Sequence, residues 1–376
     1  MDYRRFGKTE LNLSVFSLGT MRSLASASTF QATLGAALDR GINHVETARG
    51  YGQSEQLLGQ SLQTLSPAQR SDLVITTKIP PTPDAATMAE QIAESLERLQ
   101  LQHIDCLAIH GINTIEHLAW ISDPQGCMAA VQAAQAAGQI RHVGFSTHGS
   151  LEVIEGAIAT NLFEFVNLHY YLFFQRHRRA VDLAHAQDLG VFIISPGDKG
   201  GQLYQPPETL RQLCQPFEPL YLSYRWLLQD PAITTLSVGP ANPAELAYPL
   251  QVADQTDALT PAEQAALDRL ATQAHGTLGA SQCHQCYACL PCPEDINIPE
   301  ILRLRNLAVA YDMQSFGEYR YSMFERAGHW FPGRRGDRCT DCGDCLPRCP
   351  SQLPIPDLLR ETHARLKGPE RRRLWG

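Results

Sequence analysis

The sequence lacks any long apolar segment. No apolar run approaches the roughly 18 to 20 residues that cross a bilayer as a helix. The first ten residues, MDYRRFGKTE, contain no apolar signal-peptide region. We therefore expect a cytoplasmic protein with no membrane partner. Apolar residues make up 44% of the chain and charged residues 19%, a composition typical of folded globular proteins.

An excess of basic residues is also absent. Lys and Arg number 31 against 39 Asp and Glu, which gives a formal net charge of -8. The chain therefore lacks the basic character of nucleic-acid-binding proteins, and we expect no nucleic-acid partner. Its 376 residues exceed the usual size of one domain. We predict a large domain over residues 1–275 and a smaller one over residues 276–376.

The eleven cysteines are unevenly distributed. Cys106, Cys127 and Cys214 are scattered through the first 275 residues, where buried, inert thiols are the common case. The other eight form two runs, Cys283-x2-Cys286-x2-Cys289-x2-Cys292-Pro and Cys339-x2-Cys342-x2-Cys345-x3-Cys349-Pro. Disulfides are rare in a reducing compartment, and structural zinc usually takes two separated Cys-x2-Cys pairs. Three thiolates on one short loop plus a fourth cysteine before proline suit a four-iron, four-sulfur cluster, so we predict two 4Fe-4S clusters.

The second cysteine run matches the pattern of two-cluster bacterial ferredoxins, and the first is one residue short before its last cysteine. In those ferredoxins the fourth cysteine of each run ligates the other cluster. Carried over to this chain, the crossing places one cluster on Cys283, Cys286, Cys289 and Cys349, and the second on Cys339, Cys342, Cys345 and Cys292. Between the runs, apolar residues recur at helical spacing over 298–309. We therefore expect a helix-rich, ferredoxin-like domain.

Eight short, apolar, β-prone runs recur through the first 275 residues. They are VFSLGT, NHVETA, LVITTK, CLAIHG, HVGFST, FVNLHY, VFIISP and TLSVGP. Stretches of helical character separate them, such as MAEQIAESLERLQ and GCMAAVQAAQAAGQ, and this alternation predicts parallel strands with crossover helices. Eight such units close as a (β/α)8 TIM barrel. A doubly wound open sheet would normally show G-x-G-x-x-G after its first strand, and GTMRSLA does not fit that pattern.

Polar residues at the carboxyl ends of barrel strands are the candidates for chemistry, because active sites of this fold lie there. The second, third and fourth predicted strands end at or near Glu46, Tyr51, Lys78 and His110. The later four end at or near Ser146, Asn167, Ser195 and Gly239.

The first group of these residues fits proton transfer to a carbonyl. A tyrosine hydroxyl titrates near 10, so Tyr51 needs a nearby cation such as Lys78 to act as a general acid at neutral pH. Glu46 could fix the position of that lysine, and His110 could donate a hydrogen bond to a substrate carbonyl. Together these residues predict carbonyl reduction.

Several segments resemble the aldo-keto reductase superfamily over residues 1–275. They are MDYRRFGKTELNLSVFSLGTM, GINHVETARGYGQSEQLLG, VITTK, LAIHG and VGFST. The C-terminal cysteine runs resemble the branch of that superfamily that bears a ferredoxin-type domain. The family's catalytic Asp, Tyr, Lys and His fall on Glu46, Tyr51, Lys78 and His110, and the resemblance implies NAD(P)H-dependent reduction of a small carbonyl substrate. Glu46 departs from the family because it adds a methylene to the aspartate.

The resemblance also implies where the nicotinamide nucleotide lies. The family holds the carboxamide after the fifth and sixth strands, where this chain has Ser146, Thr147 and Asn167 in place of the frequent Ser-Asn and Gln. Loops after the seventh and eighth strands hold the phosphates, so Ser195, Lys199 and Gly239 are the candidates. NADPH is the predicted nucleotide and NADH the alternative, since GPANPAELAY contains Glu245 but no base.

The role of the clusters stays open at this point, because hydride transfer to a carbonyl needs no one-electron carrier. They could relay electrons to or from a ferredoxin-like partner, or they could brace the C-terminal domain. The alternative function is an electron-transfer or redox-sensing protein that uses a catalytically weakened barrel as a binding platform. Glu46 and the eighth-strand loop without a base motivate that alternative. Substrate identity and oligomeric state have no signal in the sequence.

Overall fold

A computed structural model describes residues 1–368 of the protein, so residues 369–376 of the predicted C-terminal domain lie outside the described part. The chain divides into two compact units. The first joins Met1–Gly200 to Ser223–Ala258, and the second joins Gly201–Leu222 to the chain from Leu259 onward. The predicted boundary at residue 275 falls inside helix α13 (Pro261–Leu278), which is grouped with the second unit.

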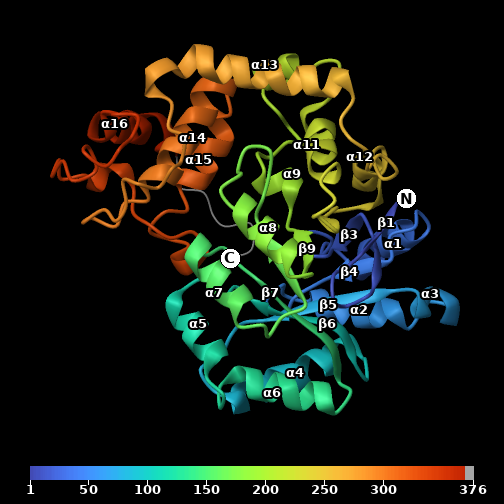
Figure 1. The fold of residues 1–376 in the computed structure, drawn as a ribbon. Coiled ribbons are helices and arrows are strands. Elements are labelled where there is room, and N and C mark those ends of the chain that lie inside the picture. Colours follow the sequence, from blue (N-terminus) through green and yellow to red (C-terminus); the bar gives the residue numbers. More distant parts are fainter. Residues whose placement is uncertain (369–376) are drawn as a thin grey trace. The chain divides into compact units, whose positions relative to one another are not determined.

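The first unit is a closed barrel of eight parallel strands in the order β10-β3-β4-β5-β6-β7-β8-β9 (Figure 1). The strands are β3 (Phe16–Gly19), β4 (His44–Glu46), β5 (Val74–Ile79), β6 (Ile104–His110), β7 (Ile140–Ser146), β8 (Phe165–Leu168), β9 (Gly190–Ile193) and β10 (Thr235–Val238). Each of the eight predicted apolar runs overlaps one of these strands. The predicted TIM barrel is therefore confirmed, and the open sheet is excluded.

Helices alternate with the barrel strands along the chain. They are α1 (Ala27–Leu38), α2 (Ser54–Leu62), α3 (Pro67–Ser71), α4 (Ala85–Leu99), α5 (Ile115–Ser122), α6 (Cys127–Ala136), α7 (Leu151–Ala159), α8 (Arg178–Ala186), α9 (Pro196–Lys199), η1 (Pro243–Leu246) and α12 (Ala247–Leu250), with α11 (Pro219–Leu228) shared between the units. Helix α4 shows why they form. Asp84 caps its first turn by accepting a hydrogen bond from the Thr87 amide, and Met88, Ile92 and Leu99 form its buried face.

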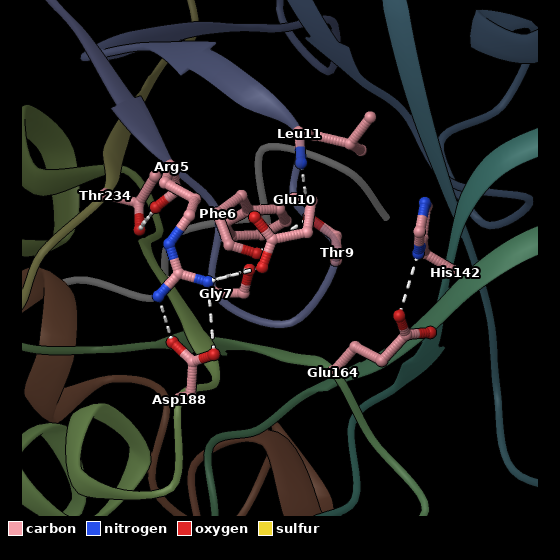
Figure 2. A network of polar contacts seen from close by, with 10 residues as sticks. All are labelled: Arg5, Phe6, Gly7, Thr9, Glu10, Leu11, His142, Glu164, Asp188 and Thr234. Carbon is pink, nitrogen blue, oxygen red and sulfur yellow. Dashed lines mark hydrogen bonds and ion pairs between the residues drawn. The ribbon is translucent and has the colours of Figure 1, made fainter.

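A hairpin that the sequence analysis did not predict lies at the amino-terminal end of the barrel. Its strands β1 (Tyr3–Arg5) and β2 (Asn12–Ser14) pair antiparallel, and Phe6 packs in a core cluster with Phe165 and Phe192. Figure 2 shows the polar contacts of this hairpin, in which the Arg5 guanidinium contacts Asp188 and Glu10. The hairpin and its phenylalanine fill the end of the barrel away from the carboxyl ends of the strands, so chemistry is confined to the other end.

The second unit is rich in helices, as predicted. It contains α10 (Glu208–Cys214), α13, η2 (Gly279–Ser281), α14 (Ile298–Tyr311), α15 (Gln314–Tyr321), η3 (Gly328–Trp330), η4 (Gly336–Arg338) and α16 (Ile355–Leu366). Helix α14, which covers the predicted helical spacing, packs against α13, α15 and α16. Ile301 and Leu304 of this helix are fully buried. Within residues 1–368, no helix is both long and apolar enough to cross a membrane.

Candidate active site and cluster sites

Four residues of the predicted catalytic set lie on neighbouring parts of the barrel's carboxyl-terminal end. Glu46 is the last residue of β4, Lys78 is the penultimate residue of β5, and His110 ends β6. These strands are adjacent in the barrel. Tyr51 lies in the loop between β4 and α2, so the fold brings all four residues to one side of the barrel mouth.

Glu46 and Lys78 form a buried ion pair. The Lys78 ammonium contacts Glu46 Oε2 and donates a second hydrogen bond to the Thr47 carbonyl oxygen at 3.0 Å. The exposed fractions are 0% for Lys78 and 4% for Glu46. Glu46 Oε1 accepts a hydrogen bond from Ser237 Oγ at 2.8 Å. The glutamate therefore keeps the lysine contact that the family makes with an aspartate.

Tyr51 packs between the lysine and the histidine. Lys78 Nζ lies 5.2 Å from the centroid of the Tyr51 ring, and the ring centroids of Tyr51 and His110 are 5.8 Å apart in an edge-to-face arrangement. The loop that carries Tyr51 is tied to β5, because the Arg49 amide donates to the Lys78 carbonyl oxygen at 3.0 Å. The Arg49 side chain donates outward to Glu94 at 3.1 Å.

Burial shifts the pKa values of Tyr51 and Lys78. Tyr51 keeps part of its surface open, yet desolvation by the surrounding protein raises the pKa of its phenol to about 12. Desolvation lowers the pKa of Lys78, and the positive charge of Lys199 lowers it further, to about 7. The tyrosine is thus a protonated donor at neutral pH, and the charge of the lysine changes near neutrality.

The residues predicted to hold the nicotinamide carboxamide differ in whether their side chains already make hydrogen bonds within the protein. Asn167, on β8, is fully buried, and neither its side-chain oxygen nor its nitrogen has a hydrogen-bond partner among residues 1–368. Such an amide costs about 1–3 kcal/mol for each unsatisfied group. A carboxamide offers an NH₂ group with two donors and a carbonyl oxygen that accepts, so this side chain fits the predicted role. The Thr147 hydroxyl donates to the Ile112 carbonyl oxygen at 2.6 Å and is committed to the backbone.

Ser146 pairs in register with His110 and with Asn167 on the two adjacent strands. Its hydroxyl oxygen accepts a hydrogen bond from the Gly111 amide at 3.1 Å, which leaves its own proton to donate. Ser146 thus stands beside both the proposed catalytic histidine and the orphaned amide.

The two predicted phosphate loops follow β9 and β10. Ser195 has a left-handed backbone with φ of 47° and precedes α9, which ends at Lys199. The Gly239 carbonyl oxygen accepts a hydrogen bond from Arg22 at 2.8 Å, and Arg22 also pairs with Glu245 at 2.9 Å. The sequence around Gly239 contains no base, but the fold brings one to it from the loop after β3.

Sequence reasoning missed Ser237 as part of this region, and it did not place Arg22 beside the phosphate loops. Ser237 and Thr235 alternate in β10 with apolar neighbours, and both are buried. A serine between apolar residues, one residue before the end of a strand, was therefore a signal that the sequence offered, because a buried hydroxyl needs a hydrogen-bond partner. The contact of Arg22 with Glu245 had no such signal, because the two residues lie 223 positions apart in the chain.

Two cavities in the second unit gather the eight clustered cysteines. One is lined by Cys283, Cys286, Cys289 and Cys349. The other is lined by Cys339, Cys342, Cys345 and Cys292. These are the two sets that the crossed ferredoxin pattern predicts. Apolar residues of α14 and α16 also line them, among them Leu302 in the first and Leu359 in the second.

Left-handed residues between the cysteines bend the loops around these cavities. Gln285 and Tyr287 have φ of 51° and 62°, and Asp341 and Gly343 have 55° and 79°. The Asn306 side chain of α14 donates to the Cys283 carbonyl oxygen at 2.9 Å and holds the first loop. None of the eleven cysteines forms a disulfide. Within residues 1–368, no three His, Cys, Asp or Glu side chains are grouped around a single-ion site.

The thiols within each set interact electrostatically. Burial raises the pKa of Cys283, and negative charge on Cys286 and Cys349 raises it further. Burial likewise raises the pKa of Cys345, and Cys339, Cys342 and Cys292 add to the effect. Four thiolates so placed need a cationic centre to stay ionised, which an iron-sulfur cluster provides. The donor sets therefore fit such clusters.

Comparison with known proteins agrees with both units. Residues 16–205 match the Aldo/keto reductase family, and residues 282–353 match the 4Fe-4S dicluster domain. The first of these matches identifies the protein as an oxidoreductase. Since the first match covers more than half of the chain, the protein belongs to the aldo/keto reductase family, and it carries a C-terminal 4Fe-4S domain.

Relatives align with about two thirds of the chain. The "Uncharacterized oxidoreductase YqkF" of Bacillus subtilis is 25% identical over 291 residues, which are 68% of this chain and 92% of the relative. The "6-dehydroglucose reductase" of Novosphingobium aromaticivorans is 25% identical over 279 residues, covering 65% and 88%. Among solved structures, the holo form of aldo-keto reductase AKR11C1 from Bacillus halodurans has a TM-score of 0.62 at 22% identity. The alignment covers 72% of this chain and 96% of that one, and it shows a shared fold.

Proposed function

We propose that this oxidoreductase reduces a small carbonyl substrate, with a nicotinamide nucleotide as hydride donor and Tyr51 as general acid. The observation that carries the proposal is the position of Tyr51 between Lys78 and His110 at the ends of adjacent strands. A relative named as a 6-dehydroglucose reductase supports a carbonyl substrate class. When bound, the nicotinamide supplies the hydride, and the Tyr51 hydroxyl supplies the proton that completes the alcohol.

Each neighbour of Tyr51 has a distinct task in this proposal. The positive charge of Lys78 stabilises the phenolate that remains after Tyr51 gives up its proton. Glu46 holds the lysine in place through their buried ion pair. His110 donates a hydrogen bond to the carbonyl oxygen as charge develops there.

The nucleotide is held by residues at the ends of the later strands. Ser146 and Asn167 bind the carboxamide, and the orphaned amide of Asn167 supports this assignment. Thr147 shapes the site without offering its committed hydroxyl. Ser195, Lys199 and Gly239 line the path of the phosphates. NADPH is the favoured nucleotide because Lys199 and Arg22 bring cations to these loops, and NADH is the alternative because Glu245 pairs with Arg22.

The C-terminal domain, residues 276–376, binds two 4Fe-4S clusters with crossed fourth cysteines in this proposal. The two cavities and their cysteine sets support it. Cys345 of the second set also contributes to the raised pKa of Cys289 in the first, so the two sets lie within electrostatic reach. When bound, the clusters supply one-electron transfer, and a ferredoxin-like donor or acceptor is the proposed partner.

Replacing Tyr51 with Phe tests the catalytic proposal. The change should lower carbonyl reduction by about 10²- to 10⁴-fold, since it removes the proton donor. Nucleotide binding and the visible absorption of the clusters should stay unchanged. Tyr3→Phe is the matched control, because Tyr3 is 44% exposed and its hydroxyl donates to the Gly41 carbonyl oxygen, away from the site. Turnover equal to that of the parent protein would remove Tyr51 from the mechanism.

A further inference from the structure

Glu46 has a second partner besides the lysine. While its Oε2 contacts Lys78, its Oε1 accepts a hydrogen bond from the Ser237 hydroxyl at 2.8 Å. Ser237 is 2% exposed, so water does not compete for this bond. A hydroxyl that donates to a buried carboxylate makes a strong, directional contact. Both oxygens of the glutamate are therefore held.

This bond crosses an intervening strand. In barrel order, Ser237 lies on β10, Gly19 on β3, Glu46 on β4 and Lys78 on β5. Gly19 is paired in register with Glu46. A Cβ atom on Gly19 would lie 2.8 Å from Ser237 Oγ, closer than real Cβ atoms come, and 3.0 Å from Glu46 Oε1, which is tighter than most real Cβ contacts. The missing side chain of Gly19 is what lets the serine and the glutamate meet.

Glu46 is one of two groups that hold the lysine ammonium. The Lys78 ammonium has three N–H groups, of which one contacts Glu46 and one donates to the Thr47 carbonyl oxygen. The third N–H group remains for Tyr51, whose ring centroid lies 5.2 Å from Nζ. If Glu46 could rotate, the direction of this third group would change with it.

We infer that Ser237 is a positioning residue that fixes Glu46, and through it Lys78, and that Gly19 makes this arrangement possible. The inference rests on the proposed function, in which Lys78 stabilises the Tyr51 phenolate. It also explains how the chain uses glutamate where the family has aspartate. Shortening the side chain by one methylene withdraws the carboxylate by about 1.5 Å. An aspartate that reached Lys78 would then leave Ser237 without its acceptor.

A double-mutant cycle tests the inference. Ser237→Ala should lower kcat about tenfold with KM unchanged, because a hydrogen bond to a charged group is lost. The basic limb of the kcat profile should move to lower pH, since Lys78 loses its ordered counter-charge. In a Glu46→Asp background the same serine change should alter kcat less than about twofold.

In the parent protein, Gly19→Ala should lower kcat about as much as Ser237→Ala does. Adding Glu46→Asp to Gly19→Ala should restore part of that kcat, because the shorter side chain moves the carboxylate away from the new methyl group.

Ser17→Ala is the matched control. Ser17 is a fully buried serine on β3 whose hydroxyl bonds His44 and Thr235 and makes no contact with Glu46. This change should leave the pH limb in place. Thermal unfolding gives a readout that does not need activity: the Tm loss caused by Ser237→Ala should shrink in the Glu46→Asp background. An equal loss of kcat and Tm in both backgrounds, or parental kinetics for Ser237→Ala, would overturn the inference. If the parent protein showed no nicotinamide-dependent carbonyl reduction, the proposed function would be wrong. The Tm values of the same four proteins would still test whether Ser237 and Glu46 interact.

Discussion

The two units of this protein place their reactive residues in different ways. In the barrel, the catalytic candidates lie at the ends of strands that are held by parallel hydrogen bonding and by a fully buried apolar core. In the second unit, the cysteines lie on irregular loops between helices, several of their intervening residues are left-handed, and burial and mutual charge raise the pKa of thiols in both sets. The difference teaches that the barrel positions its candidates by strand pairing and packing, whereas the cysteine loops arrange theirs around cavities that suit a metal cluster.

Removal of iron is expected to have the largest effect of the changes considered, because it should unfold part of the second unit and leave the barrel folded. Because four thiols line each cavity and burial disfavours their charged form, metal binding supplies much of the folding free energy of the cysteine loops. Anaerobic chelation should lower the helical circular dichroism that α14 and α16 contribute, while the barrel still unfolds in one cooperative transition. Differential scanning calorimetry checks this. Loss of both transitions together would show that the barrel is not independent of the clusters.

Cys349→Ser sharpens the comparison within the second unit. Crossed ligation predicts that this change removes the cluster of the other run, so iron should fall from about eight to about four atoms per chain. The electron paramagnetic resonance spectrum of the remaining cluster should match that of Cys286→Ser and differ from that of Cys342→Ser. Cys127→Ala, at a buried cysteine of α6, should keep about eight iron atoms. A match to Cys342→Ser would contradict the crossing.

Lys199→Ala gives a smaller, pH-dependent effect in the barrel. The charge of Lys199 helps to lower the pKa of Lys78 to about 7, so its removal should raise that pKa. Since the charged form of Lys78 supports catalysis in the proposed mechanism, the basic limb of kcat at saturating nucleotide should move to higher pH. Lys199→Arg keeps the charge and should leave the limb in place. If the basic limb of the kcat profile did not move in Lys199→Ala, the charge of Lys199 would not influence the pKa of Lys78.

Much of this arrangement was predictable from the sequence, for identifiable physical reasons. Each barrel strand is a short apolar run, and parallel strands must end on one face, so Glu46, Lys78 and His110 could be placed together from their positions alone. The cysteine spacing likewise predicted the two sets that line the cavities. These signals are local in the chain.

What the sequence did not predict depends on contacts between distant residues. Ser237 meets Glu46 across 191 positions, and Arg22 meets Glu245 across 223. The amino-terminal hairpin was also missed, because its two strands have only three residues each. Short strands have too little periodicity to stand out, and long-range polar pairs leave no local pattern.

The central claim, that the barrel binds a nicotinamide nucleotide, has a direct test. The protein with intact clusters is titrated anaerobically with NADPH and with NADH, and binding is followed by the fluorescence of the reduced nucleotide. The account predicts saturable binding of one nucleotide per chain, tighter for NADPH, and weaker binding in Asn167→Ala, which removes the orphaned amide. Failure of both nucleotides to bind would contradict it and would favour the barrel as a binding platform of an electron-transfer protein.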